Sequence, residues 1–220
     1  MAKTGKRAIA FLLSVLLVVS ALVCLPAAAD AGSSADYLDA DGSLATAENV
    51  TALTDAAPAL TAGWYLVSGD VSIAERIRCS GDVSLILADG ATLTASKGIT
   101  VGWNSSLTVF GQSAGTGALK VDQVADYCAG IGGESNGSSG NITINGGALT
   151  VTGGYYGAGI GGGDYGSGAV TVNRGKLVIY GGDYAAGIGG GRFGEGTVTV
   201  NGGNVWACGG VYSAAIGGGY

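Results

Sequence analysis

The chain has 220 residues, of which 44 are glycine, 2 are proline and none is histidine, and its formal net charge at pH 7 is −6. The lack of histidine removes the most common general base and the most common transition-metal ligand. The excess of acidic side chains disfavours nucleic acid as a partner. The glycines lack the three-residue period of collagen, so they indicate turns and not a triple helix.

The first 29 residues have the layout of a secretory signal peptide. Three basic residues precede an apolar run over residues 8–25, and Ala27 and Ala29 supply the small residues of a cleavage site. The run is short for a membrane span, so we expect export with cleavage after Ala29, and a membrane anchor is the alternative. Seven basic against sixteen acidic side chains then leave a net charge of −9 on the mature chain. The sequence thus predicts a secreted or cell-surface protein without a membrane span in its mature chain.

Residues 30–48 are rich in Ser, Gly and Asp and show little apolar periodicity, so we interpret them as a leader or linker. From residue 49 the chain forms short apolar runs with two-residue alternation, separated by Gly-Asp and Asp-Gly turn signals, which predict irregular strands over 49–126. We expect Trp64 and Tyr65 to cover the N-terminal end of the core. The runs occupy 63–68, 71–73, 76–79, 83–87, 91–94, 99–101, 107–110 and 117–121.

Residues 127–220 contain one motif three times and the start of a fourth copy. The tyrosines that open the copies are separated by 29, 28 and 28 residues, and isoleucines and asparagines recur in the same register. Within a copy, a Gly-rich stretch around the isoleucine precedes two alternating runs, such as 169–173 and 176–180. This fixed period predicts a repeat array with three short strands in each unit. The recurring residues are Tyr127, Tyr156, Tyr184 and Tyr212; Ile131, Ile160, Ile188 and Ile216; and Asn145, Asn173 and Asn201.

These features predict an all-β fold, a parallel β-helix with about 28 residues in each regular coil. Identical side chains would then lie above one another about 4.8 Å apart. Val170 and Val172 would point inward and Thr171 outward. The asparagines would form an amide ladder, since each side chain carries both donors and an acceptor, and the tyrosines would stack edge to edge along a corner. The sequence stops partway into the fourth copy, so we expect 127–220 to be truncated.

Several motifs, which together cover nearly all of the mature chain, carry a resemblance to a known group of proteins, and the repeat motifs among them are specific. They are GWYLVSGDVSIAERIRCSGDVSLILADGATLTASKGITV over 63–101, SLTVFGQSAGTGAL over 106–119, and the repeated AGIGGG and VTVNGG. In these motifs the chain resembles the exported, Gly-rich β-helical repeat proteins of Firmicutes-type bacteria. It is more distantly similar to the pectate-lyase-type β-helix superfamily, whose members bind or cleave polysaccharides and often contain an asparagine ladder. The resemblance implies a right-handed parallel β-helix at the cell surface.

The acidic side chains supply the candidates for calcium and for catalysis. Asp164 and Asp183 are the calcium candidates, although the nine-residue period of calcium-binding repeats is missing, and no other cofactor is expected. An enzyme would depend on carboxylates, because two carboxyl groups about 5 to 9.5 Å apart can hydrolyse a glycosidic bond. The candidates lie at different places in the repeat, so we predict a non-enzymatic protein, with a polysaccharide lyase or hydrolase as the alternative. They are Glu134, Asp164, Asp183 and Glu195, with Arg174, Lys176 and Arg192 as basic partners.

The three cysteines of the mature chain are Cys79, Cys128 and Cys208. Their number is odd and their spacing is not that of a metal site, and Cys128 and Cys208 lie about three copies apart. We therefore expect small buried or half-buried thiols, with a disulfide as the alternative.

A binding role is predicted from two aromatic residues. Alternation through 176–180 places Tyr180 on the outer face, and Trp206 takes the place of Val178 one copy later. Tyr180 and Trp206 would then form a flat aromatic patch of the kind on which sugar rings stack. We predict a carbohydrate-binding or adhesion module whose partner is a polysaccharide or a cell-surface glycan, with a purely structural stalk as the alternative.

Overall fold

The structure, a computed structural model, describes residues 33–220; the predicted signal peptide lies outside the described residues. Every helix or strand that forms between residues 33 and 220 is a β-strand, which confirms the all-β prediction. Within this range there is no apolar helix long enough to cross a membrane.

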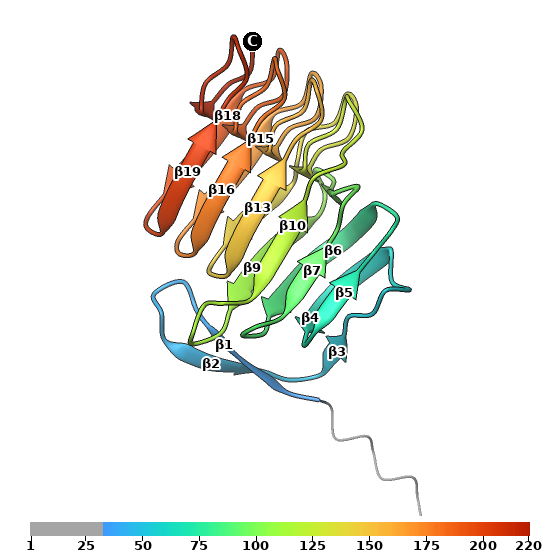
Figure 1. The fold of residues 1–220 in the computed structure, drawn as a ribbon, viewed down its shortest axis with the longest axis vertical. Coiled ribbons are helices and arrows are strands. Elements are labelled where there is room, and N and C mark those ends of the chain that lie inside the picture. The colour runs from blue at the N-terminus through green and yellow to red at the C-terminus, as the bar shows by residue number, and fades with distance from the viewer. Residues whose placement is uncertain (1–32) are drawn as a thin grey trace, which may run out of the picture. The chain divides into compact units, whose positions relative to one another are not determined.

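Two parallel sheets make up most of the described chain (Figure 1). The six-stranded sheet has the order β19-β16-β13-β10-β7-β5, and the twelve-stranded sheet contains the strands that precede each of these along the chain. The first comprises β5 (Asp70–Ser72), β7 (Thr92–Thr94), β10 (Ala118–Val121), β13 (Ala148–Thr152), β16 (Lys176–Tyr180) and β19 (Asn204–Cys208). The second comprises β3 (Val50–Ala52), β4 (Ala59–Val67), β6 (Ile77–Leu87), β8 (Ile99–Val101), β9 (Ser106–Gly111), β11 (Ile131–Gly132), β12 (Asn141–Ile144), β14 (Ile160–Gly161), β15 (Gly168–Val172), β17 (Ile188–Gly189), β18 (Gly196–Val200) and β20 (Ile216–Gly217).

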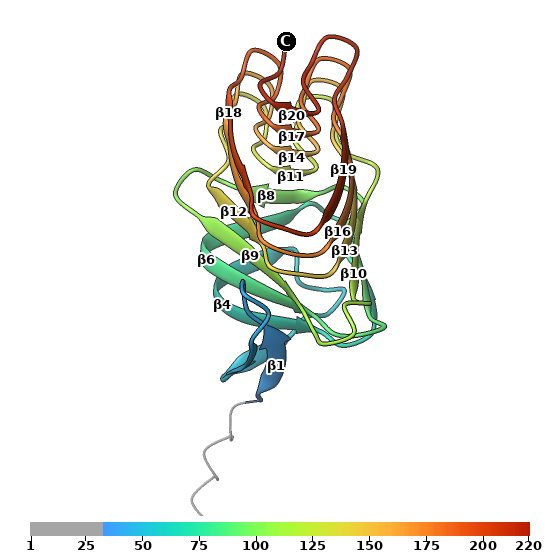
Figure 2. The same ribbon diagram turned by 90° about the vertical axis from the view of Figure 1, so that its left-hand side faces the viewer.

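The copies of the sequence motif pair in register, position against position. Ile160 of β14 pairs with Ile131 of β11 on one side and with Ile188 of β17 on the other. In the same way, Val170 of β15 pairs with Val198 of β18. Each copy contributes three strands, the short Ile-Gly strand and two longer ones. Loops project on both sides of the Ile-Gly strands β11, β14, β17 and β20 (Figure 2). Parallel pairing therefore stacks equivalent loops, as well as equivalent strands, next to one another.

Side chains from both sheets meet in one apolar core. Ile142 and Val170 of the twelve-stranded sheet and Leu149 and Leu177 of the six-stranded sheet are all buried in it. Burial alternates along the strands, as in β15, where Val170 and Val172 are buried and Thr171 is half-buried. This alternation is what a strand with one face on a core requires. In the last two strands of the twelve-stranded sheet, β18 and β20, the core positions Val200 and Ile216 are 45% and 44% exposed.

The segment that we interpreted as a leader or linker contains an antiparallel hairpin. Strands β1 (Ala35–Leu38) and β2 (Leu44–Ala47) pair along their full length, and the ring of Tyr37 lies 4.9 Å from that of Trp64 and 4.6 Å from that of Phe110. Ala35 and Ala47 are buried in the same cluster. The linker expectation failed for this part because the hairpin is anchored by three aromatic rings that are distant in sequence.

Trp64 does not cover the end of the core as expected. It packs in the cluster under the hairpin, whereas its neighbour Tyr65 packs against the main core. Successive side chains of a strand point to opposite faces of the sheet. Trp64 therefore faces the hairpin and Tyr65 faces the main core. The hydroxyl of Tyr65 donates to the carbonyl oxygen of Thr61 at 3.0 Å.

Two of the predicted runs merge into one strand. β6 extends from Ile77 to Leu87 through Gly81, where a turn was expected, and it pairs with both β8 and β9. Gly81 has a φ of 78°, which glycine adopts without steric cost, so the strand continues through this position. In the next layer the corresponding strands β8 and β9 are separate, and residues 102–105 form a loop between them.

The buried thiol provides a prediction on pH dependence. The three cysteines between residues 33 and 220 are free, and burial raises the pKa of the Cys79 thiol to about 12 from 9.0. A raised pKa in the folded state favours the protonated thiol, so this stabilisation is complete below pH 9.0 and is lost as the pH rises toward about 12. Iodoacetamide at about pH 8 should modify the exposed Cys208 and should reach Cys79 only in denaturant. Mass spectrometry of the labelled peptides tests this, and native labelling of Cys79 would contradict it.

Candidate functional site

Tyr180 and Trp206, the predicted binding pair, lie side by side on neighbouring strands β16 and β19. Trp206 pairs with Val178, so Tyr180 and Trp206 are offset by two residues along the strands. Tyr180 is 40% exposed and Trp206 is 50% exposed. The ring centroids are 4.8 Å apart, but the planes meet at 65°. The pair is therefore an edge-to-face contact and does not form one flat platform.

The repeated tyrosines form a continuous column, which we call the tyrosine column: Tyr127, Tyr156, Tyr184 and Tyr212. Consecutive ring centroids are 5.3, 5.7 and 5.8 Å apart and the planes differ by 29°, 31° and 27°. The rings thus stack nearly face to face, where edge-to-edge packing was expected, because equivalent residues of stacked loops are related mainly by translation. Neighbouring rings of the column therefore cover part of each other's faces.

A second aromatic row occupies the loops that lead into β15 and β18. Tyr165 and Phe193 are 57% and 56% exposed, and their ring centroids are 5.2 Å apart. Both have positive φ, 56° and 57°, as does Asn136 with 56° at the equivalent place one copy earlier. Asparagine adopts this left-handed conformation readily, whereas a bulky aromatic residue rarely does. The backbone of this position would suit asparagine or glycine better than the aromatic residues that occupy it.

Arg192 joins the two rows. Its Nε and Nη2 atoms donate to the two carboxylate oxygens of Asp164 at 2.8 Å each, and its guanidinium carbon lies 3.8 Å from the centroid of the Tyr156 ring. The same carbon is 5.3 Å from the ring of Tyr165 and 5.2 Å from that of Phe193. Hydrogen bonding to Asp164 raises the pKa of Arg192 above its ordinary value, so the guanidinium remains charged. A cation over the face of a ring is attracted by its electrons, so Arg192 fixes both rows.

We call the combined surface the aromatic rim. Tyr155 and Tyr220 complete it: Tyr155 meets Tyr156 edge to face at 4.6 Å, and Tyr220 lies 5.9 Å from Tyr184 and 6.0 Å from Phe193. Sequence reasoning assigned a structural role to the tyrosine column and missed the other members. The signal was available, since Tyr165 and Phe193 follow Asp164 and Arg192 at the repeat spacing. The rim comprises Tyr127, Tyr155, Tyr156, Tyr165, Tyr184, Phe193, Tyr212 and Tyr220.

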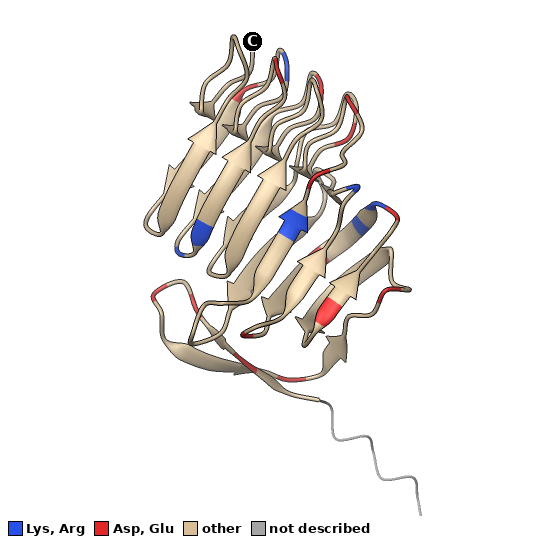
Figure 3. Ribbon diagram, in the orientation of Figure 1, with Lys and Arg blue, Asp and Glu red and all other residues tan. Residues whose placement is uncertain are grey.

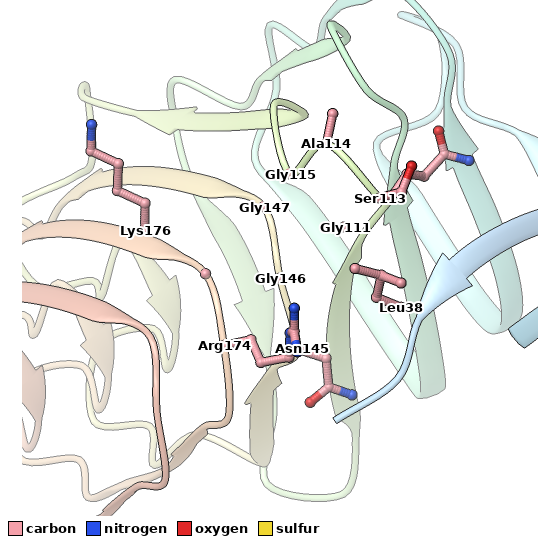
Figure 4. A pocket seen from close by; sticks show the side chains of 12 residues that line it. Leu38, Gly111, Ser113, Ala114, Gly115, Asn145, Gly146, Gly147, Arg174 and Lys176 are labelled. Atoms are coloured by element: carbon pink, nitrogen blue, oxygen red, sulfur yellow. The ribbon is translucent and has the colours of Figure 1, made fainter. Parts of the chain in front are cut away.

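The asparagines of the repeats lie in a ladder. Asn173 Nδ2 donates to Asn145 Oδ1 at 2.8 Å, and Asn201 Nδ2 donates to Asn173 Oδ1 at 2.7 Å. Arg174 and Lys176 lie near this ladder and line a pocket of about 270 Å³, and the Lys176 side chain points away from Asn145 (Figure 4). The two basic candidates thus do not converge on one point.

The carboxylate candidates are dispersed or already paired. Asp164 is 3% exposed and both of its oxygens bind Arg192, so a calcium ion there would have to displace the guanidinium. Asp183 and Glu195 are exposed on loops, and Glu134 forms an ion pair with Arg78. Between residues 33 and 220 there is no group of three or more Cys, Asp or Glu side chains arranged to hold a metal ion. Acidic residues are spread over loops and over the hairpin (Figure 3).

Comparisons of the chain with protein-family models, with curated proteins and with solved structures give no match. Function therefore has to be argued from the surfaces described above.

Proposed function

We propose that this chain is a secreted or cell-surface, right-handed parallel β-helix with about 28 residues per regular coil, and that it binds carbohydrate without cleaving it. The in-register parallel pairing of the copies and the three strands in each copy support the β-helix. The signal-peptide pattern and the resemblance to exported Gly-rich repeat proteins support the location. The aromatic rim is the proposed binding surface.

The observation that carries the proposal is the pair of exposed aromatic residues in the left-handed conformation. A residue held in this region costs about 1 to 3 kcal/mol unless its surroundings or its role compensate. Tyr165 and Phe193 keep that conformation while more than half exposed, although Asn136 shows that the same turn accommodates asparagine. Contacts with each other and with Arg192 still leave more than half of each residue exposed, so we attribute the aromatic rings at this place to ligand binding.

The chemistry of the rim suits an amphipathic, extended ligand. The stacked tyrosines present hydroxyl-bearing edges in a row, and a tyrosine hydroxyl can both donate and accept a hydrogen bond. Tyr165 and Phe193 add apolar surface parallel to that row, and sugar rings combine apolar faces with rim hydroxyls. A polymer that runs along the stacked loops would meet equivalent side chains at regular intervals. Tyr180 and Trp206 are a second, separate candidate surface on the six-stranded sheet.

A glycan array tests the proposed function. The chain from Asp30 onward would be applied with calcium and, separately, with a chelator. We expect retention on at least one polysaccharide and no release of products from it. Retention that disappears with the chelator would show that calcium takes part, whereas silence across the array from a folded sample would overturn the proposal and favour a structural stalk. Release of oligosaccharides would favour a lyase or hydrolase instead.

A further inference from the structure

A pocket of about 510 Å³ lies between the first two loops on one side of the Ile-Gly strands. Trp103, from the loop 102–105, and Glu134 and Asn136, from the loop 133–140, are among the residues that line it. An isolated antiparallel bridge between Gly102 and Ser139 ties the two loops together. The pocket is distinct from the aromatic rim as defined above, since none of the rim residues lines it.

The pocket exists because consecutive loops differ in length. In the later copies Gly163 and Gly191 occupy the position of Glu134, and a Cβ atom on either would overlap a backbone carbonyl of the preceding loop. The loop with Glu134 spans residues 133–140 between β11 and β12. The loop stacked before it is shorter and spans only residues 102–105 between β8 and β9. The shorter loop leaves room, so the first long loop of the stack can carry a side chain where the others require glycine.

The Glu134 carboxylate is held through one oxygen. Its Oε1 accepts from Thr100 Oγ1 at 2.7 Å, pairs with Arg78 Nη1 at 2.6 Å and lies 3.6 Å from Arg76 Nε. Among the described residues, no hydrogen bond or ion pair engages Oε2. The Glu134 side chain is 34% exposed, so Oε2 is available as an acceptor on a group whose orientation is fixed.

Arg76 makes this support rigid. Its side chain is only 12% exposed, and its Nη1 and Nη2 atoms donate to the carbonyl oxygens of Lys97 and Ala129 at 2.7 and 2.8 Å. Burial lowers the pKa of Arg76, and the neighbouring Cys128 and Glu134 oppose that shift. An arginine remains protonated under ordinary conditions, so it anchors the carboxylate electrostatically.

Trp103 offers an aromatic face that no other ring of the described chain covers. It is 78% exposed, and within residues 33–220 it makes no ring-to-ring contact. A large exposed indole beside a fixed hydrogen-bond acceptor combines an apolar surface with a polar anchor, the usual composition of a small-ligand site.

We propose that this pocket binds a single neutral sugar residue. The ring stacks on Trp103, and hydroxyl groups of the sugar donate hydrogen bonds to Glu134 Oε2. Glu134 Oε2 accepts a hydrogen bond from a sugar hydroxyl, whereas an ionised sugar carboxylate only accepts and has no proton to donate to it, so the site favours neutral sugars over uronic acids. This inference rests on the proposed carbohydrate function and adds to it the chemical class of one bound residue.

The test measures binding of soluble sugars to the chain from Asp30 onward. Glucose, galactose, mannose and N-acetylglucosamine, their β-linked disaccharides, and galacturonic acid would be titrated by calorimetry. We expect at least one neutral sugar to bind and galacturonic acid to bind more weakly. Trp103→Ala should weaken binding of the neutral sugar about tenfold, which corresponds to about 1.4 kcal/mol, because it removes the stacking surface. Glu134→Gln should weaken it while keeping the side-chain shape.

The control is Leu44→Ala in β2, which removes an apolar side chain that is 67% exposed and lies outside the pocket, and it should leave sugar binding unchanged. Trp103 is exposed, so its variant should keep the thermal unfolding midpoint of the parent chain. Three results would overturn the proposed sugar site: equal affinity of Trp103→Ala and the parent chain, tighter binding of galacturonic acid, or no binding of any neutral sugar. If the chain is still retained on a polysaccharide after such a result, the aromatic rim remains the proposed binding surface. Failure of the pocket proposal is therefore distinguishable from failure of the proposed function.

Discussion

Replacing both Tyr165 and Phe193 with asparagine is expected to abolish retention on the glycan while leaving the fold intact. The double variant removes two rings that are 57% and 56% exposed and puts asparagine into the φ region that Asn136 already occupies. Relief of the left-handed strain gains about 1 kcal/mol at each position. Loss of the ring-to-ring contact costs about 1 kcal/mol, and loss of the Arg192 contacts with the two rings costs about 1 kcal/mol more. The free energy of unfolding should therefore stay nearly unchanged.

Affinity electrophoresis in the polysaccharide found by the array measures retention, and urea unfolding measures stability. The control is Tyr180→Ala combined with Trp206→Ala, which removes the other exposed aromatic pair. Loss of retention in the control and not in the rim variant would move the binding site to the six-stranded sheet. Full retention in both variants would contradict both proposed surfaces.

The second large effect is expected from Gly161→Ala. Gly161 has a φ of 135°, and a Cβ atom at this position would overlap the carbonyl oxygen of Gly189 in the next strand. A side chain would be strained by the φ and would also push β14 and β17 apart, so we expect a loss of at least about 3 kcal/mol in the free energy of unfolding. Urea unfolding followed by far-ultraviolet circular dichroism measures it.

Gly69→Ala is the matched control for this prediction. Nothing lies within 4 Å of a Cβ atom at Gly69, and its φ is not among the positive ones. The same chemical change should therefore alter the free energy of unfolding by less than about 1 kcal/mol, because alanine fits this position and restricts the unfolded chain. Equal stability of the two variants would show that the Ile-Gly strands tolerate greater separation than their close packing indicates.

The location of the candidate site was only partly accessible from the sequence. The 28-residue spacing identified Tyr156 and Tyr184 as stacked residues, and alternation placed Tyr180 and Trp206 on adjacent strands. The spacing carries no information on ring planes, which depend on side-chain torsions and neighbours. The 65° angle between Tyr180 and Trp206, and the guanidinium of Arg192 over Tyr156, became known only from the packed structure.

The sequence by itself determined the all-β class, the three strands of each copy and the residues that face the core, because repeat period and alternation are local properties of the chain. Only the tertiary structure decided that residues 35–47 form a hairpin on Trp64 and Phe110, that Asp164 is neutralised by Arg192, and that Glu134 lines a pocket with Trp103. Each of these contacts joins residues from different elements, and the pocket depends on a difference in length between two stacked loops. Such contacts follow from how the layers pack, and a linear pattern does not record them.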